Sequence, residues 1–262
     1  MKIKHPLVKG EVKEVFPKIF CVTVDDNYDR AMLFCRYQEF YESPTKEFRG
    51  KYFSWSKFMR YYKDHWKKDT FTYPIDWTGY NIPSKSLEKS IDAFRNESEY
   101  DLIMFDIWVY CFNLTSEIYN EHDFYLIGAS SKDLRTMDHE IAHGLYFTNK
   151  NYRNAMSYQF HLIPEKTKEK IFKKLIKMGY ADDKNILVDE AQAFLSTGLY
   201  NGLDIKEIKK ARKEIIGTGD KEALKKFDRE TAISKGTSVN IAMEASCENT
   251  SRTSLCDLCL EL

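Results

Sequence analysis

Residues 139–143 read His-Glu-Ile-Ala-His, two histidines four positions apart with a glutamate after the first. Positions four apart lie on the same face of a helix, so His139 and His143 can offer two imidazole nitrogens to one metal ion. Glu140 lies about 100° further round the helix, where it can reach a water on the ion rather than the ion itself. Imidazoles are common ligands of tetrahedral Zn²⁺, so this spacing predicts a zinc site with one ion per chain.

The residues around the motif predict a strand followed by a two-faced helix. FYLIGAS, residues 124–130, has the apolar run of a strand, and a helix is predicted over about residues 132–147. Met137, Ile141 and Leu145 fall roughly opposite the two histidines on this helix. The helix therefore has an apolar face for packing and a separate face that carries the histidines and the glutamate.

A catalytic zinc site needs three protein ligands and an open position, so a third ligand must come from elsewhere in the chain. Glu190 lies on the apolar face of a helix predicted over about residues 183–196, where a carboxylate is costly unless it is paired or bound to metal. Its neighbours Asp189 and Gln192 are predicted to point elsewhere. Glu165 is the alternative ligand, although it opens a Lys- and Glu-rich helix, where the helix dipole alone favours a glutamate.

Hydrolysis of an amide also needs a donor for the negative charge that develops on the carbonyl oxygen. The candidates for this role, or for binding the substrate, are Tyr146, Tyr180, Tyr200 and His161. The chain holds 17 tyrosines, so their positions in the sequence alone do not choose among them.

With His139-Glu140-x-x-His143, the strand before it and the later Glu190, the chain resembles the zincin metallopeptidases, and among them the gluzincins. The resemblance covers roughly residues 124–198. It implies an α+β fold with a mostly helical core and a small mixed sheet, in which the active-site helix lies beneath an edge strand that pairs with an extended substrate. It also implies zinc bound by the two histidines and Glu190, Glu140 as general base, and a peptide or protein substrate.

Two other functions are compatible with the same residues. The first is a zinc amidase or hydrolase that acts on a non-peptide substrate, and the second is a binding protein whose zinc is structural. A closed fourth coordination position favours the structural role, whereas a water on the metal within reach of Glu140 favours an enzyme.

The composition divides the chain into three regions: an aromatic-rich α+β region over residues 1–123, the metal-binding core over residues 124–203, and a charged helical extension with a flexible tail over residues 204–262. A strand is predicted over residues 19–24. Further helices are predicted over about residues 27–43, 54–66, 84–94, 102–119 and 164–178. The tail carries Cys247, Cys256 and Cys259, too few ligands for a closed zinc site.

Two segments of the first region each have two interpretations. RYQEFYES, residues 36–43, places Arg36, Glu39 and Glu42 among aromatic residues, so these side chains either form a buried ion pair or line a substrate cleft. YPIDWTGYNIPS, residues 73–84, is predicted as an ordered loop, either a structural turn or one side of the substrate site.

The charge balance and the hydropathy exclude several classes of protein. The 40 basic side chains are matched by 40 acidic ones, which argues against a general nucleic-acid binder. No apolar run approaches the ~18 residues of a membrane span, and the N-terminal residues lack the apolar stretch of a signal peptide. We therefore expect a soluble, cytoplasmic protein with free thiols and with neither nucleic acid nor membrane as a partner. The sequence does not indicate an oligomeric state.

Overall fold

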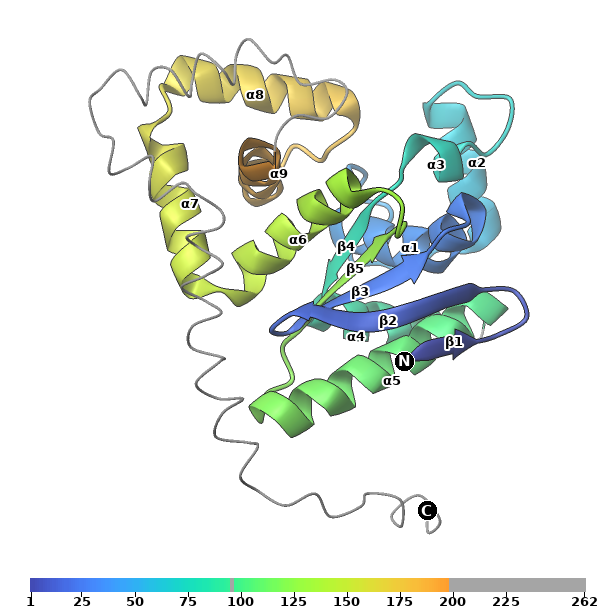
Figure 1. Ribbon diagram of the computed structural model, residues 1–262. Helices are drawn as coiled ribbons and strands as arrows, with labels where there is room; N and C mark the ends of the chain where they lie inside the picture. Colours follow the sequence, from blue (N-terminus) through green and yellow to red (C-terminus); the bar gives the residue numbers. More distant parts are fainter. Residues whose placement is uncertain (95–96, 198–262) are drawn as a thin grey trace, which may run out of the picture.

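The computed structural model describes residues 1–94 and 97–197, which form an α+β fold (Figure 1). The strands are β1 (Lys2–Lys4), β2 (Lys9–Phe16), β3 (Ile19–Val24), β4 (Tyr80–Pro83) and β5 (Tyr125–Ala129). The helices are α1 (Asn27–Glu42), α2 (Trp55–His65), α3 (Tyr73–Asp76), α4 (Ser84–Phe94), α5 (Glu99–Tyr119), α6 (Leu134–Thr148), α7 (Lys150–Leu162), α8 (Glu165–Met178) and α9 (Lys184–Thr197). The extension predicted over residues 204–262 lies outside the described residues.

The strands form one mixed sheet in the order β1-β2-β3-β5-β4. β3 and β5 are parallel, whereas β4 runs antiparallel to β5 along the free edge. The expectation that residues 124–130 form the edge strand is therefore wrong. All five residues of β5 are buried without polar alternation, which is typical of a strand covered on both faces. The sheet takes strands from both sides of position 123, so the first two regions of the chain share it.

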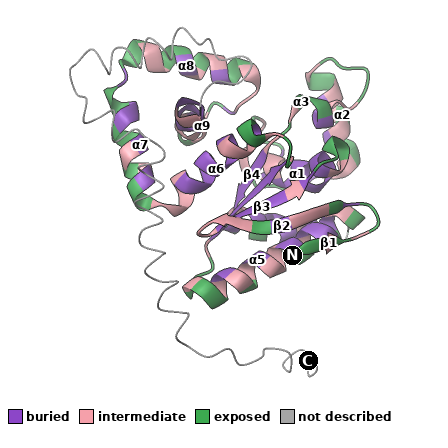
Figure 2. Ribbon diagram, viewed as in Figure 1, coloured by how far each residue is buried: buried purple, intermediate pink, exposed green. Residues whose placement is uncertain are grey.

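Alternate residues of the two central strands point into two different cores, because successive side chains of a strand face opposite sides of the sheet. Phe20, Val22 and Leu126 join a large aromatic core that packs under α1, α4 and α5. Ile19 and Ile127 join a smaller core on the other face. Figure 2 shows both faces of these strands buried between helices.

Helix α6 covers that second face of the sheet. Ile141 and Leu145 are buried against β3 and β5, as their spacing in the sequence predicts. Gly144 allows a close approach, since a Cβ atom there would lie only 2.8 Å from Cγ2 of Ile19. The face of α6 that carries His139 and His143 is thereby turned away from the sheet.

Helices α7, α8 and α9 form a layer on the side of α6 remote from the sheet (Figure 1). Their own core holds Ile171, Leu175, Leu187 and Phe194. Helix α8 ends at Gly179, whose φ of 110° is in the left-handed region, and the chain turns there into α9. This layer brings α9 against α6, although the two helices are far apart in the sequence.

Most of the predicted helices are present, but five elements were missed, among them the short helix α3 in the segment predicted as a loop. Residues 2–16 form the β1–β2 hairpin, residues 150–162 form α7, and residues 80–83, predicted as a loop, form β4. Helix α7 is polar along most of its length and is held by Tyr152, Met156 and Phe160, buried at a spacing of four residues. Among the described residues, no helix is long and apolar enough to cross a membrane.

A buried ion pair fixes α1 in the aromatic core. The Arg36 guanidinium is fully buried and contacts Asp101 at 3.2 Å and Glu97 at 2.7 Å. Tyr37 donates a hydrogen bond from its hydroxyl to Asp101 at 3.1 Å. Arg36 does form a buried ion pair, but its partners come from the segment around the start of α5 and not from Glu39 or Glu42 of its own segment, which corrects the prediction.

Replacing Asp101 by alanine is expected to lower the free energy of unfolding by about 3 kcal/mol, because the change leaves a buried guanidinium with only one carboxylate. Urea unfolding would measure the loss. Asp106→Ala is the matched control, since Asp106 is an exposed residue of the same helix and its loss should change stability little. Equal stability of the two variants would contradict a stabilising role for Asp101.

Candidate metal centre

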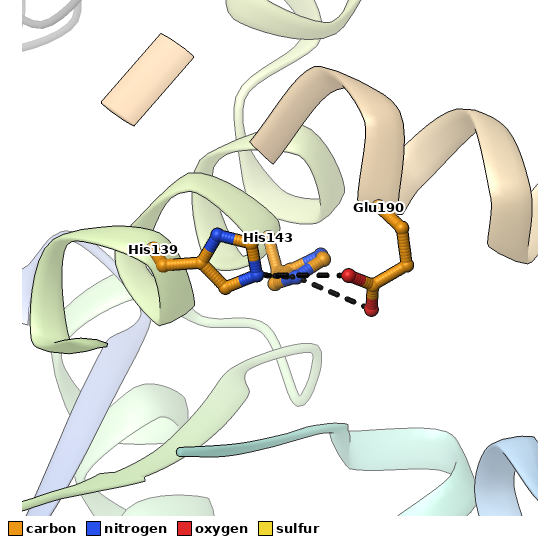
Figure 3. Close-up of side chains that lie close together, drawn as sticks. All are labelled: His139, His143 and Glu190. Atoms are coloured by element: carbon orange, nitrogen blue, oxygen red, sulfur yellow. Dashed lines mark hydrogen bonds and ion pairs between the residues drawn. The ribbon is translucent and has the colours of Figure 1, made fainter. Parts of the chain in front are cut away.

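Helices α6 and α9 bring two histidines and one glutamate together. The Nε2 atoms of His139 and His143 are 3.3 Å apart. The Glu190 carboxylate reaches both rings, with Oε1 at 3.5 Å from His143 Nε2 and Oε2 at 3.6 Å from His139 Nε2. All three side chains are buried, and Figure 3 shows them converging on one space between the helices.

These separations fit a tetrahedral zinc ion. Bonds of about 2.0–2.1 Å from zinc to its ligands place neighbouring ligand atoms about 3.3–3.4 Å apart. The observed 3.3, 3.5 and 3.6 Å lie close to that value and exceed most ordinary N–H···O distances. Among the described residues, this is the one such group of three with the spacing and side chains to hold a metal ion.

Glu190 reaches the histidines because α9 packs on α8 and α6 through the residues beside it. Leu187, Ala191 and Phe194 are buried in the core of the outer layer. The carboxylate therefore lies within an apolar face, as the sequence predicts. The alternative ligand, Glu165, is at the exposed start of α8, where its carboxylate contacts Lys168 at 3.3 Å and is not among the residues of the site.

The charges of the site favour a cation at its centre. Burial alone would lower the pKa of His143, but the Asp189 and Glu190 carboxylates outweigh burial and hold that pKa well above its usual value. Burial opposes ionisation of Glu190, yet His143 and His139 bring its pKa below the usual value. The Asp189 and Glu190 carboxylates thus favour positive charge at His143, and a bound cation would replace the proton there, because metal ligation needs the neutral imidazole.

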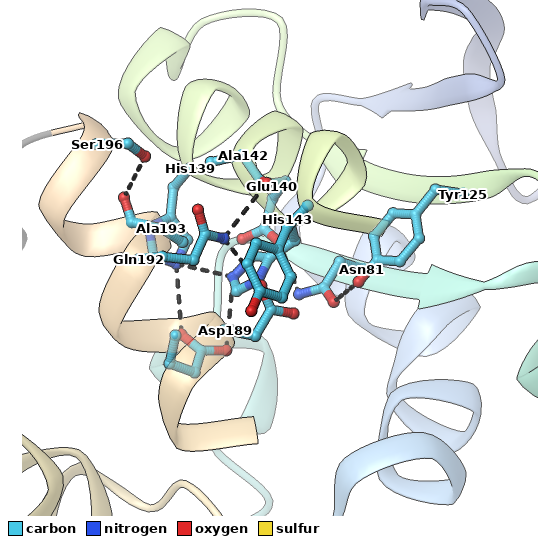
Figure 4. A network of polar contacts seen from close by, with 12 residues as sticks. Asn81, Tyr125, His139, Glu140, Ala142, His143, Asp189, Gln192, Ala193 and Ser196 are labelled. Atoms are coloured by element: carbon cyan, nitrogen blue, oxygen red, sulfur yellow. Dashed lines mark hydrogen bonds and ion pairs between the residues drawn. The ribbon is translucent and has the colours of Figure 1, made fainter. Parts of the chain in front are cut away.

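Asp189 and Gln192 also belong to the site, which corrects the prediction that they point elsewhere. Oδ1 of Asp189 lies 3.1 Å from Nδ1 of His143, and Gln192 donates from Nε2 to the same oxygen at 2.8 Å (Figure 4). Tyr152 donates to Oε1 of Gln192 at 3.1 Å. Because α9 crosses α6 closely, Asp189 and Gln192 contact α6, as Glu190 does. Asp189 orients the His143 ring so that Nε2 faces the site.

Glu140 is held by Asn81 of β4, which Tyr125 of β5 holds in turn. Asn81 donates from Nδ2 to Oε2 of Glu140 at 2.9 Å, and Tyr125 donates from its hydroxyl to Oδ1 of Asn81 at 2.7 Å. These two bonds orient both the amide and the carboxylate. Burial raises the pKa of Glu140, which makes it a stronger base than an exposed carboxylate. Asn81 was not predicted as a site residue. The only indication in the sequence was its place in segment 73–84, one interpretation of which was a side of the substrate site.

Gly79 allows the base to lie against the start of β4. A Cβ atom at this position would be 2.2 Å from Oε1 of Glu140, closer than any real contact. We expect Gly79→Ala to displace the carboxylate and, in any reaction for which Glu140 is the base, to lower the rate by about 10²-fold, while the metal content is unchanged. Steady-state kinetics and metal analysis on one preparation would measure both effects.

Gly50→Ala is the control for this prediction. It adds the same methyl group where no atom lies within 4 Å, at a glycine whose φ of 69° makes the substitution strained but local. An unchanged rate in the Gly79 variant would show that a reaction served by Glu140 does not need the carboxylate at this position.

The metal centre opens into a cavity of about 330 Å³ that all three candidate ligands and Glu140 line. The cavity has an apolar side formed by Trp77, Met178, Tyr180 and Phe194. Because the three candidate ligands face open space, a metal ion held by them would keep one coordination position accessible from the cavity. Residues 77–79 line this cavity, so the segment 73–84 contributes to one side of the site as well as forming a turn and a strand.

Helix α1 supplies a further polar side of the cavity. Gln38 accepts the backbone N–H of Asn81 at 2.9 Å through Oε1, and its Nε2 donates to Glu42. Burial, together with the nearby charge of Glu190, raises the pKa of Glu42 well above its usual value. The segment 36–43 thus contains a buried ion pair at one position and cavity residues at two others.

The four candidate donors to the carbonyl oxygen differ in whether they line the cavity of the candidate metal centre. Tyr180 lines the cavity, where burial and the nearby Glu190 carboxylate raise the pKa of its hydroxyl well above the usual value. The Tyr146 hydroxyl lies 3.1 Å from Oγ of Ser157 and lines a neighbouring cavity. His161 is exposed near the end of α7 and does not line the cavity, and Tyr200 lies outside the described residues. Tyr180 is the candidate that meets the site.

Comparison of the chain with protein-family models, with curated proteins and with solved structures finds no match.

Proposed function

We propose that the protein is a zinc-dependent hydrolase that cleaves peptide bonds. One observation carries this proposal: two histidines and a glutamate are buried at tetrahedral spacing, with Glu140 beside them at the wall of an open cavity. The open position supports an enzyme over a structural zinc site, because structural sites are closed by four protein ligands. The combination also supports a gluzincin-like peptidase, in which a carboxylate from a later helix completes the ligand set.

Each residue then has one task. His139, His143 and Glu190 hold the ion. When bound, zinc supplies Lewis acidity, which lowers the pKa of water towards about 7 and polarises a carbonyl. Glu140 accepts the proton of the attacking water and delivers it to the leaving amine. Tyr180 donates a hydrogen bond to the oxygen of the reacting carbonyl as its negative charge develops.

The shape of the cleft supports an extended substrate. The central cavity shares Asp76, Trp77, Met178 and Tyr180 with a second cavity of about 310 Å³. On its other side, it shares Glu42 and Glu190 with a third cavity of about 370 Å³. A chain of several residues spans adjacent cavities, whereas a compact small molecule fills one.

Backbone pairing with the substrate is restricted to a short segment. The N–H of Asn81 on the free edge of β4 is already bonded to Gln38. Residues 77–79, just before β4, line the cavity, but the Trp77 N–H and the carbonyls of Trp77 and Thr78 are already bonded. Pairing with an extended peptide is therefore limited to the Thr78 N–H and the backbone of Gly79.

The test is the zinc content of the purified protein, measured by elemental mass spectrometry, followed by cleavage of a peptide library. We expect about one zinc per chain, lost in His139→Ala and retained in His161→Ala, the exposed histidine that serves as the control. Protein that contains no zinc, and takes none up when zinc is added, would overturn the proposal. A zinc-loaded protein that cleaves no member of the library would refute a peptide substrate.

A further inference from the structure

A separate cavity adjoins the metal centre on the side of α7. Its volume is about 370 Å³, and it shares Glu42 and Glu190 with the central cavity. The cavity lies between the C-terminal end of α6 and the starts of α7 and α9. Its other lining residues include Tyr41, Arg49, Tyr146, Arg153 and Asn185.

The carboxylates that line this cavity are already engaged. Asp183 contacts Arg49 at 3.2 Å, so that pair is neutral. Asp189 holds the His143 ring, Glu190 is a candidate zinc ligand, and Glu42 accepts a hydrogen bond from Gln38. Of these acids, only Asp183 pairs with an arginine of the cavity.

Arg153 is the cation that remains. Its NH1 donates to the carbonyl oxygens of Tyr146 and Phe147 at 3.0 and 2.8 Å, at the end of α6. Within residues 1–94 and 97–197, no carboxylate forms an ion pair with it. The two carbonyls fix the guanidinium without neutralising it, and they use only one of its three nitrogens. A planar guanidinium held in this way is suited to bind a carboxylate through its remaining N–H groups.

We propose that this cavity binds a carboxylate of the substrate and that Arg153 recognises it. The inference rests on the proposed hydrolase and narrows its substrates to peptides with a negative charge a short distance from the scissile bond. That charge has two sources, the C-terminal carboxylate of a short peptide and an acidic side chain. Both present the same planar anion to Arg153.

Matched inhibitors test the inference by binding alone. Peptides of one to three residues, capped by a hydroxamate that ligates zinc, would be made in pairs that end in a free carboxylate or in a carboxamide. Calorimetric titration of the zinc-loaded protein gives the Kd of each. At the length that reaches Arg153, we expect the free acid to bind about 10- to 100-fold more tightly, the value of a charge-assisted contact. A third series, with a C-terminal glutamate amide, separates an acidic side chain from the chain terminus.

Variants identify the residue responsible. Arg153→Met should remove the preference for the carboxylate and leave the Kd of the carboxamide unchanged, whereas Arg153→Lys should keep part of the preference. Arg60→Met is the control, because Arg60 is an exposed residue of α2 outside the cleft. Zinc content verifies that each variant is folded at the site, since Arg153 also contacts the end of α6.

Equal affinities for the acid and the carboxamide at every length would overturn the inference and leave the hydrolase intact. A preference that persists in Arg153→Met would overturn it as well. Failure of the proposed function is visible before any inhibitor is added, because the protein would then bind no zinc, and the inference would fall with it.

Discussion

Replacing Glu140 by glutamine is expected to abolish turnover while the protein keeps its zinc. The amide has nearly the same size as the carboxylate, so the packing against Gly79 is preserved, but it cannot accept a proton from water. Loss of a positioned general base costs about 10²- to 10⁴-fold in rate. The measurement is the cleavage rate of a library-derived peptide, with zinc content determined on the same preparation.

Glu117→Gln is the matched control, because Glu117 is an exposed glutamate of α5 far from the motif in the sequence. It should leave both the rate and the zinc content unchanged. Undiminished turnover in Glu140→Gln would refute the role of Glu140 as the base. Loss of zinc from that variant would show instead that Glu140 is itself a ligand.

Glu190→Gln is expected to weaken zinc binding by more than about 100-fold. Residues that merely orient a ligand contribute about 10- to 100-fold in affinity, and loss of a ligand charge should cost more. The variant leaves two neutral imidazoles and removes the buried charge that faces the ion. Competition with a chelator of known affinity would measure the change.

Glu165→Gln separates the two glutamates that the sequence offers as third ligand. Glu165 is exposed and contacts Lys168, so its replacement should leave zinc affinity unchanged. The reverse result, with zinc lost from Glu165→Gln and retained by Glu190→Gln, would mean that α9 does not complete the site.

The sequence predicts those parts of the site that depend on the periodicity of a single helix. The four-residue spacing of His139 and His143 needs only the pitch of an α-helix. The sequence predicts Glu190 as a ligand because a carboxylate among apolar neighbours on one helix face is costly unless it is paired or bound to metal. The opposite face of α6, with Ile141 and Leu145 against the sheet, follows from the same periodicity.

The parts that could not be predicted depend on how distant segments pack. β4 has four residues and includes a proline, and it becomes a strand only by pairing with β5. Asn81 and Gly79 therefore reach Glu140 through a pairing that no local pattern encodes. Asp189 was misplaced for a similar reason, because the crossing of α9 over α6 decides which of its faces meets His143.

The two helices of the candidate metal centre belong to different packing layers. α6, with His139 and His143, rests on the sheet, whereas α9, with Glu190, is packed with α7 and α8. An ion held by all three side chains would act as a cross-link between these layers, and its binding free energy would also be folding free energy for the outer one. The concentration of free zinc would then determine whether the cleft is assembled as well as whether it is active.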